Sequence, residues 1–252
     1  MTNCFRFALR QLIKNPAFTV TALATVAICL GANLAIFAVI NSILLRPLPF
    51  PQSDRLVTIF NTYPKAGVEN DGSSLTNYYE RRGNIPAISS LSIFRDFSEV
   101  VGETGAAEQT EIMRVSPDFF ATLGVNLAMG RTFTEDEDEI AKGKGAGVAI
   151  VTDAYWRQRL NSDPNVLGRD IRVNTMPRKI VGVLPPDFRF LSSEARLFLP
   201  IRSRLEERTP QQRHYSGGTH MIARLKPGAT MAEAQSQIDA HNAAVEEDNP
   251  EA

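Results

Sequence analysis

Residues 17–45 read AFTVTALATVAICLGANLAIFAVINSILL, a run of 29 residues without Asp, Glu, Lys, Arg or His. At about 1.5 Å per residue, a helix of this length extends roughly 43 Å, more than the roughly 30 Å hydrocarbon core of a bilayer. The apolar region of a cleaved signal peptide is shorter, about 7 to 15 residues, and ends in a small-x-small site. This stretch instead runs into Arg46-Pro47-Leu48-Pro49. We therefore predict an uncleaved transmembrane helix over 17–45, with a signal peptide as the alternative.

The charges that flank the apolar stretch predict its orientation. Arg6, Arg10 and Lys14 precede it without any acidic residue, whereas Asp54 accompanies the basic residues that follow it. An excess of Lys and Arg marks the cytoplasmic side of a span, so we expect residues 1–16 to be a cytoplasmic lead-in. The three basic residues recur every four positions. They either form one face of a helix that lies on the membrane surface or simply flank the span.

Small side chains recur along the predicted helix at helical spacing. The residues expected to pack against partner helices are Ala24, Ala27, Gly31, Asn33, Ala35 and Ala38. No hydrophobic force drives helices together in lipid, so close backbone approach and a polar group such as Asn33 would hold them. The alternative is that alanine is merely common. The prolines after Arg46 further predict a stiff exit that transmits movement between membrane and domain.

The rest of the chain, residues 46–252, predicts one large or two small folded domains. It carries 24 basic and 28 acidic residues, a formal charge of −4, which disfavours nucleic acid as a partner. About 200 residues of ordinary apolar content are enough to bury a core. Both cysteines, Cys4 and Cys29, lie before or within the apolar stretch. We therefore expect the outer domain to be stabilised by packing rather than by disulfides.

Strand and helix patterns follow one another without strict alternation, which predicts an α+β fold. Strands are expected at 55–61, 90–101, 108–115, 148–152, 170–174, 178–184, 197–201 and 219–226, and helices at 73–83, 116–124, 154–160 and 231–245. Ser116 is the expected N-cap of one helix, with Gly124 just past its end, and Asp153 is expected to cap the next helix. The strands on either side of Asn174 are expected to form a hairpin.

The residue patterns predict no enzyme, no cofactor and no metal site. The acidic run from Glu135 to Glu139 lacks the alternating ligands and the glycine of an EF-hand, so we interpret it as a solvated loop. His214 and His220 do not have the spacing of a zinc-binding helix, which favours ordinary surface histidines. Trp156 has aromatic and basic neighbours that would suit ligand stacking, but such a pair in a short helix more often belongs to the core.

Several segments, in order, resemble the MacB/FtsX-type ABC transporter permeases and their periplasmic core domain. These segments are FRFALRQL (5–12), KNPAFT (14–19), GAN (31–33), LLRPLP (44–49), PDFF (117–120), LGV (123–125), GRTF (130–133), DPNVLG (163–168) and VGVLPPDF (181–188). Within that family the pattern is similar to the acidobacterial branch of duplicated permeases, which are often orphaned from an ATPase gene.

The resemblance implies a first transmembrane helix followed by a two-lobed periplasmic domain, in which a porter-like part flanks an inserted lobe. Residues 219–245 would return to the porter-like part. It further implies a permease-type subunit in the bacterial inner membrane that couples ATP hydrolysis by a separate cytoplasmic ABC ATPase to movement of the outer domain, for efflux or release of a substrate. The alternative function is a single-pass, membrane-anchored binding module without a transport role.

The expected partners are the membrane, the ATPase, and further permease helices or a second copy of the chain. Two features depart from the family. Its members continue into at least three more transmembrane helices, so we expect this chain to be a fragment or to work with helices from other chains. They also usually place glycine after the asparagine of the hairpin turn, where this chain has Thr175.

Overall fold

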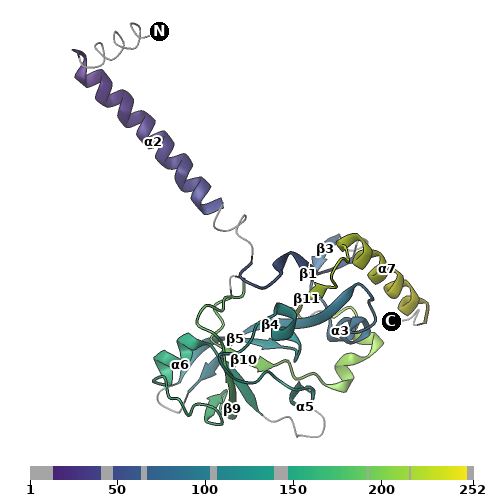
Figure 1. Cartoon of the computed structure of the whole chain (residues 1–252). Coiled ribbons are helices and arrows are strands. Elements are labelled where there is room, and N and C mark those ends of the chain that lie inside the picture. Colours follow the sequence, from purple (N-terminus) through teal and green to yellow (C-terminus); the bar gives the residue numbers. More distant parts are fainter. Residues whose placement is uncertain are drawn as a thin grey trace. The chain divides into compact units, whose positions relative to one another are not determined.

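A computed structural model describes residues 14–40, 48–63, 67–102, 107–138, 147–191, 193–215 and 217–248. The chain divides into two compact units, Met1–Leu48 and Pro49–Ala252. The first unit is built on α2 (Pro16–Ile40), a helix of 25 residues (Figure 1). Its segment Pro16–Ala38 is long and apolar enough to cross a membrane, and none of it is buried. The end predicted for this helix at Leu45 lies outside the described residues.

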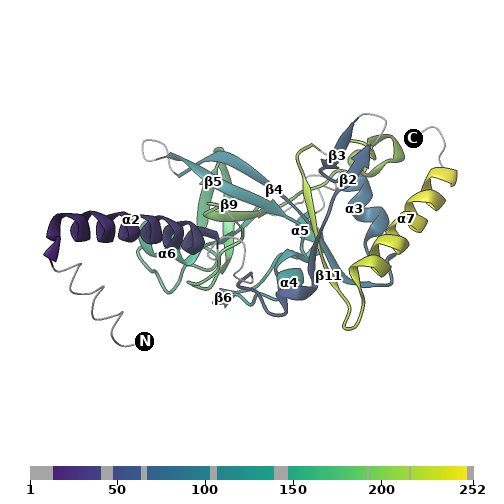
Figure 2. The same ribbon diagram turned by 90° about the horizontal axis from the view of Figure 1, so that it is seen from above.

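One mixed sheet organises the second unit (Figure 2). Its strand order is β1-β11-β4-β5-β10-β7-β9-β6, and β8 lies beside β9 and the end of β4. The strands of this sheet are β1 (Leu56–Ile59), β4 (Ile88–Val101), β5 (Glu108–Val115), β6 (Met129–Gly130), β7 (Val148–Val151), β8 (Asp170–Val173), β9 (Met176–Val183), β10 (Leu197–Pro200) and β11 (His220–Leu225). The pairs β10–β5 and β7–β9 are parallel, and the other pairs are antiparallel. A separate ladder joins β2 (Asn61–Tyr63) and β3 (Val68–Asp71).

Short and long helices cover this sheet. They are α3 (Leu75–Arg81), α4 (Phe119–Leu123), α5 (Glu135–Asp138), α6 (Asp153–Arg159) and α7 (Met231–Asp248), with 3-10 turns at Ser53–Arg55, Leu205–Arg208 and Pro210–Gln212. Helices α3 and α7 pack on β1, β11 and β4, where Ile59, Tyr78 and Ile238 share a buried cluster. Helix α4 packs on the opposite face, because successive strand residues point to opposite sides and Phe94 of β4 contacts Phe119.

The connectivity confirms the predicted two-lobed α+β fold. Strands β5 to β10 and helix α6 form one end of the sheet around a second cluster that includes Val151, Tyr155 and Ile180. The chain then returns through β11, which pairs with β4 on one side and with β1 on the other. The lobe is therefore an insertion between β4 and β11, and residues 220–248 complete the part that β1, α3 and β4 began.

The hairpin of β8 and β9 is confirmed, with a two-residue turn at Asn174 and Thr175. Both turn residues have positive φ angles, 48° and 68°, as a type I′ turn requires. Strand β3 was not predicted, because Val68–Asp71 reads as a polar loop and becomes a strand only by pairing with β2.

Two predicted helix starts are wrong. Helix α4 begins at Phe119 rather than Ser116, whose hydroxyl accepts a hydrogen bond from the Ile93 backbone N–H at 3.1 Å. Gly124 ends this helix as predicted, with φ 71°. Helix α6 is capped by Thr152 rather than by Asp153. Asp153 instead accepts a hydrogen bond from an arginine one turn later.

Candidate functional site

The polar side chains of α2 are hydrogen-bonded within the helix. Thr21 and Thr25 donate from Oγ1 to the carbonyls four residues earlier at 2.9 Å, and Thr19 does so at 3.0 Å. Asn33 Nδ2 donates to the Cys29 carbonyl at 2.8 Å. A spanning helix needs such internal partners because hydrocarbon offers none. The helix is therefore suited to lipid in its hydrogen bonding as well as in its composition.

The small residues of α2 lie on one face. At about 100° per residue, Ala24, Ala27, Gly31, Ala35 and Ala38 fall within an arc of about 80°. A Cβ placed on Gly31 would meet nothing within 4 Å, so this face is open.

Asn33 lies about 180° from Ala24. The stripe of small residues and Asn33 therefore cannot serve the same helix contact, and the packing roles expected of them stay predictions. Of the predicted basic residues, Lys14 is exposed, whereas Arg6 and Arg10 lie outside the described residues.

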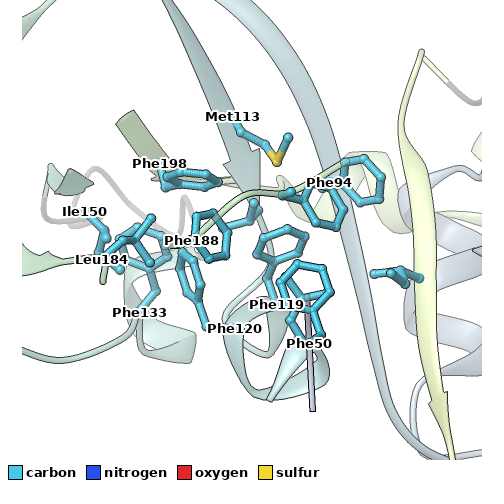
Figure 3. Close-up of a cluster of buried hydrophobic side chains, with 14 of the residues drawn as sticks. Phe50, Phe94, Met113, Phe119, Phe120, Phe133, Ile150, Leu184, Phe188 and Phe198 are labelled. Carbon is cyan, nitrogen blue, oxygen red and sulfur yellow. The ribbon is translucent and has the colours of Figure 1, made fainter. Parts of the chain in front are cut away.

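The segment that enters the second unit is fixed in its core by Phe50. This residue is 7% exposed and belongs to the largest hydrophobic cluster (Figure 3). Its ring centroid lies 6.2 Å from those of Phe188 and Phe190, and Phe188 in turn contacts Phe120 and Phe198. Aromatic pairs at such distances add about 0.5–1.5 kcal/mol to the burial of the rings. Residue 50 is thus held by the segment between β9 and β10, which in turn packs on α4 and β10.

Two arginines clamp the same segment onto β11 and α4. Arg55 donates from Nε and Nη2 to the Leu225 carbonyl at 2.9 and 2.6 Å. In the opposite direction, Arg224 donates from Nη1 to the Gln52 carbonyl at 3.1 Å and from Nε to the Thr122 carbonyl at 2.7 Å. Charged donors on backbone carbonyls are among the stronger hydrogen bonds of proteins. The segment 50–55 is therefore tied to the rest of the domain by hydrogen bonds in both directions.

Gly124, at the end of α4, lies beside this segment. A Cβ on Gly124 would make ordinary contacts, 3.4 Å from Arg224 Nη2 and 3.6 Å from Pro51 Cβ, so it is the φ of 71° that favours glycine here. We call residues 50–55 with Gly124, Arg224 and Leu225 the junction. The sequence predicted that the prolines after Arg46 stiffen the segment that leaves the helix. It predicted none of the contacts of the junction, because Arg55 and Leu225 are 170 residues apart in the sequence.

Only half of the described acidic run is solvated as the sequence predicted, because Glu135 and Asp136 are exposed but the two carboxylates after them are buried. Glu137 and Asp138 are buried in α5, at 7% and 1% exposure. Glu137 accepts two hydrogen bonds from Arg131 and one from the Thr134 backbone N–H. Asp138 accepts hydrogen bonds from Tyr79 Oη and from the Arg202 backbone N–H. Burial raises the pKa of the Asp138 carboxyl. The two buried carboxylates of the run are therefore paired within the domain.

The histidines His214 and His220 are both exposed. The part of the chain that the structure describes holds no group of three or more His, Cys, Asp or Glu side chains able to bind a metal. Trp156 packs against the second cluster and donates from Nε1 to the Asp163 carbonyl at 2.9 Å. Its predicted core role is therefore confirmed.

The chain thus combines an apolar helix of spanning length with a two-lobed domain that contains an inserted lobe. Residues 19–241 match the family described as the MacB-like periplasmic core domain, and the chain belongs to that family. The family and the apolar helix together indicate a membrane-anchored protein with an extracytoplasmic domain and a transporter-associated role.

One curated relative is the macrolide export ATP-binding/permease protein MacB of Chromobacterium violaceum. It is 27% identical over 130 residues, which are 51% of this chain and 19% of that protein. The match thus spans about a fifth of the relative's length.

Solved structures share the fold at low identity. The periplasmic region of MacB from Actinobacillus actinomycetemcomitans is 14% identical with a TM-score of 0.52, and the match covers 76% of this chain and 84% of that one. A domain of a putative permease protein from Porphyromonas gingivalis is 18% identical with a TM-score of 0.54, covering 78% and 84%.

Proposed function

We propose that this chain is a permease-type subunit, or the first part of one, in an ABC export or mechanotransmission system. A separate cytoplasmic ATPase hydrolyses ATP, and the outer domain moves in response to drive efflux or release of a substrate. The chain sits in the bacterial inner membrane with residues 1–16 in the cytoplasm, residues 17–45 across the bilayer and residues 46–252 outside. Further permease helices or a second copy contact the face formed by Ala24, Gly31 and Ala35.

The junction carries this proposal. A tether that only keeps a binding domain near the membrane works equally well with a loose linker. Here Phe50 is buried among aromatic rings, and Arg55 and Arg224 bind backbone carbonyls in both directions. Displacement of residue 50 therefore displaces the domain, because the segment has no slack of its own between residues 50 and 55. Family membership supports the same reading, since the curated relative is named as an ATP-binding/permease protein.

Insertion of a flexible segment tests the proposal. We would insert Gly-Gly-Ser between Leu48 and Pro49, which separates the two units without touching the buried side chains. The matched control is the same insertion between Pro227 and Gly228, in an exposed turn where Gly228 has φ 82° and no atom near its Cβ position. Both variants would be returned to the source bacterium lacking the gene, and survival would be measured against exported compounds, starting with macrolides.

We expect the Leu48/Pro49 insertion to abolish protection while the control retains it, with equal amounts of both proteins in the membrane. Equal protection by both variants would reject mechanical coupling.

Equal protection by the two insertion variants would favour the alternative function, a single-pass binding module. One observation speaks for it: a groove of about 530 Å³ between β1 and α7. Replacing Gly31 and Ala35 with leucine separates the two functions further. A binding module tolerates these changes in the helix, whereas a subunit packed against other helices loses its partners.

A further inference from the structure

Strands β4, β5, β10, β7, β9 and β8 close into a barrel in that order. Each strand pairs with the next, and β8 pairs back with β4 through Val173 and Val101. Side chains of a barrel strand alternate between the interior and the exterior. The second cluster, which includes Ile112 and Ile180, fills the interior. Because apolar side chains pack the middle of the barrel, a site for a polar ligand belongs at one of its mouths.

Charged side chains share the interior side of the barrel with this apolar cluster. In β9, Arg178 lies two residues before Ile180, and strand alternation turns both to the same side. In β5, Arg114 stands in the same relation to Ile112. By the same rule Glu99 of β4 faces the interior, and the residue is 8% exposed. The barrel therefore carries ionised groups on the side where its core lies.

Glu99 connects this charged region to the hairpin turn of β8 and β9. Its Oε2 accepts a hydrogen bond from Asn174 Nδ2 at 3.0 Å, and its Oε1 accepts one from Arg114 Nη2 at 2.7 Å. The guanidinium of Arg114 also lies over the ring of Phe97, with Cζ 5.2 Å from the centroid. The charged region thus lies at the mouth beside the hairpin turn, and Arg114 is held there by two contacts.

Three arginines meet at this mouth. Arg202 comes three residues after Leu199, the register partner of Arg114, so it follows β10 at the same end. Burial lowers the pKa of the Arg178 guanidinium, and the charges of Arg202 and Arg114 lower it further. The charge of Glu99 acts in the opposite direction. Such effects act between neighbouring groups, so Arg114, Arg178 and Arg202 form one group, which we call the arginine cluster.

The arginine cluster has hydrogen-bond donors to spare. The Nε atoms of all three arginines are buried and have no hydrogen-bond partner among the residues that the structure describes. Arg178 is 5% exposed, so its guanidinium has given up most of its water. Unpaired charged donors are costly in this situation. The Arg114 side chain is 22% exposed, which leaves the cluster within reach of solvent.

The charge and shape of the cluster define the chemistry of a ligand. Three guanidinium groups and one carboxylate leave two net positive charges. The Nε–H and the adjacent Nη–H of an arginine form a fork that suits two oxygens of one phosphate or carboxylate. A phosphate dianion balances both charges, whereas a carboxylate balances one. A phosphate group therefore satisfies the charge and the unused donors together.

We propose that this mouth of the barrel binds a phosphate group, with its oxygens on the Nε donors of Arg114, Arg178 and Arg202. The ligand is the free ion or the end group of a phosphate monoester. The site is separate from the junction and from the small-residue face of α2. It does not depend on the proposed role in transport, because it needs neither an ATPase nor a partner helix.

Thermal unfolding of the detergent-solubilised full chain tests the proposal, with the fluorescence of Trp156 as the signal. Sodium phosphate would replace sodium chloride up to about 30 mM at about pH 8 and constant ionic strength. A ligand that binds only the folded state raises the melting temperature as its concentration passes the dissociation constant. Sodium acetate and glycerol 3-phosphate would be titrated in the same way.

We expect phosphate to raise the melting temperature of the wild type by about 4 °C at the highest concentration. Arg178→Gln and Arg202→Gln should each weaken phosphate binding about tenfold or more, because each removes a charged donor. Glu99→Gln should strengthen it about tenfold, because it removes the negative charge beside the ligand. The matched control is Lys179→Gln, which removes a positive charge from the exposed side of β9 and should respond like the wild type.

The proposal is overturned if phosphate stabilises the wild type no more than chloride does. It is also overturned if both arginine variants bind phosphate like the wild type. If Arg178→Gln does not fold, Arg202→Gln and Glu99→Gln decide, and unchanged affinity in both rejects the site. A shift with acetate as large as that with phosphate would reject phosphate as the ligand.

Glycerol 3-phosphate separates the two sources of the phosphate group. Stabilisation equal to that by phosphate supports the end group of a monoester, and stabilisation by phosphate alone supports the free ion. Loss of this binding leaves the proposed transport function standing, because the insertion at Leu48 and Pro49 tests that function without any phosphate ligand.

Discussion

Replacing Phe50 with alanine tests whether the junction is part of the folded core. The ring is 7% exposed and contacts Phe188 and Phe190. Truncation of buried phenylalanine costs about 3–5 kcal/mol, and because this ring lies at the start of the domain we expect the lower end, about 3 kcal/mol. For a domain of this size the midpoint temperature should fall by about 6–12 °C.

Phe60 is the matched control, because it is the same residue type and is 48% exposed. A half-exposed ring loses about 1 kcal/mol or less when truncated. The two variants should therefore differ by about 2 kcal/mol, which is roughly a 30-fold difference in the unfolding constant.

Urea unfolding of the detergent-solubilised full chain, followed by the fluorescence of Trp156, measures both variants. Trp156 is the single tryptophan of the chain and belongs to a different cluster from Phe50. Its signal therefore reports cooperative unfolding rather than a local change at the junction. Equal losses for Phe50→Ala and Phe60→Ala would refute the claim that the entering segment is anchored in the core.

Three further predictions concern other parts of the chain. Thr175→Gly should raise the unfolding free energy by about 1 kcal/mol, because a β-branched residue is strained at φ 68°; a lower melting temperature would contradict this. A hydrogen bond from Arg82 holds the pKa of Glu135 below its usual 4.5, so this pair stabilises the fold above that pH and the contribution is lost as the pH falls. Between about pH 6 and about pH 4 the urea concentration at the unfolding midpoint should fall less for Glu135→Gln than for the wild type. Equal falls for the two proteins would exclude the Arg82–Glu135 pair as a cause of the pH dependence of stability. Gly31→Leu should reduce recovery of partner permease helices from native membranes, whereas Val26→Leu on the opposite face should not; equal recovery would remove the role of the small-residue face.

Elements whose structure depends on the local sequence pattern were predicted correctly. The apolar helix follows from an uninterrupted stretch of sequence, and the β8–β9 hairpin follows from two alternating segments around Asn174. Gly124 marks the end of α4 because a left-handed residue is needed there, and glycine adopts that conformation most readily.

Features that depend on distant partners were not predictable from local pattern. Ser116 looks like a helix cap, but its hydroxyl bonds a backbone N–H of β4 that is 23 residues away. The acidic run looks solvated, but Tyr79 reaches Asp138 across 59 residues. The clamp between Arg55 and β11 spans most of the domain. Only the folded chain brings these groups together, so the candidate site was found in the structure and not in the sequence.

The most direct test of the central claim is whether the outer domain moves when ATP is hydrolysed on the other side of the membrane. With Cys4 and Cys29 changed to serine, a donor fluorophore on Met176→Cys would be placed on the outer domain, where the side chain is 59% exposed. Acceptors on lipid headgroups would report its distance from the bilayer in vesicles made from native membranes that retain the ATPase.

We expect ATP to change the transfer efficiency, vanadate to hold the changed value, and the Gly-Gly-Ser insertion between Leu48 and Pro49 to abolish the change. An efficiency that is the same with and without ATP, in vesicles where ATP is being hydrolysed, would contradict the proposed coupling.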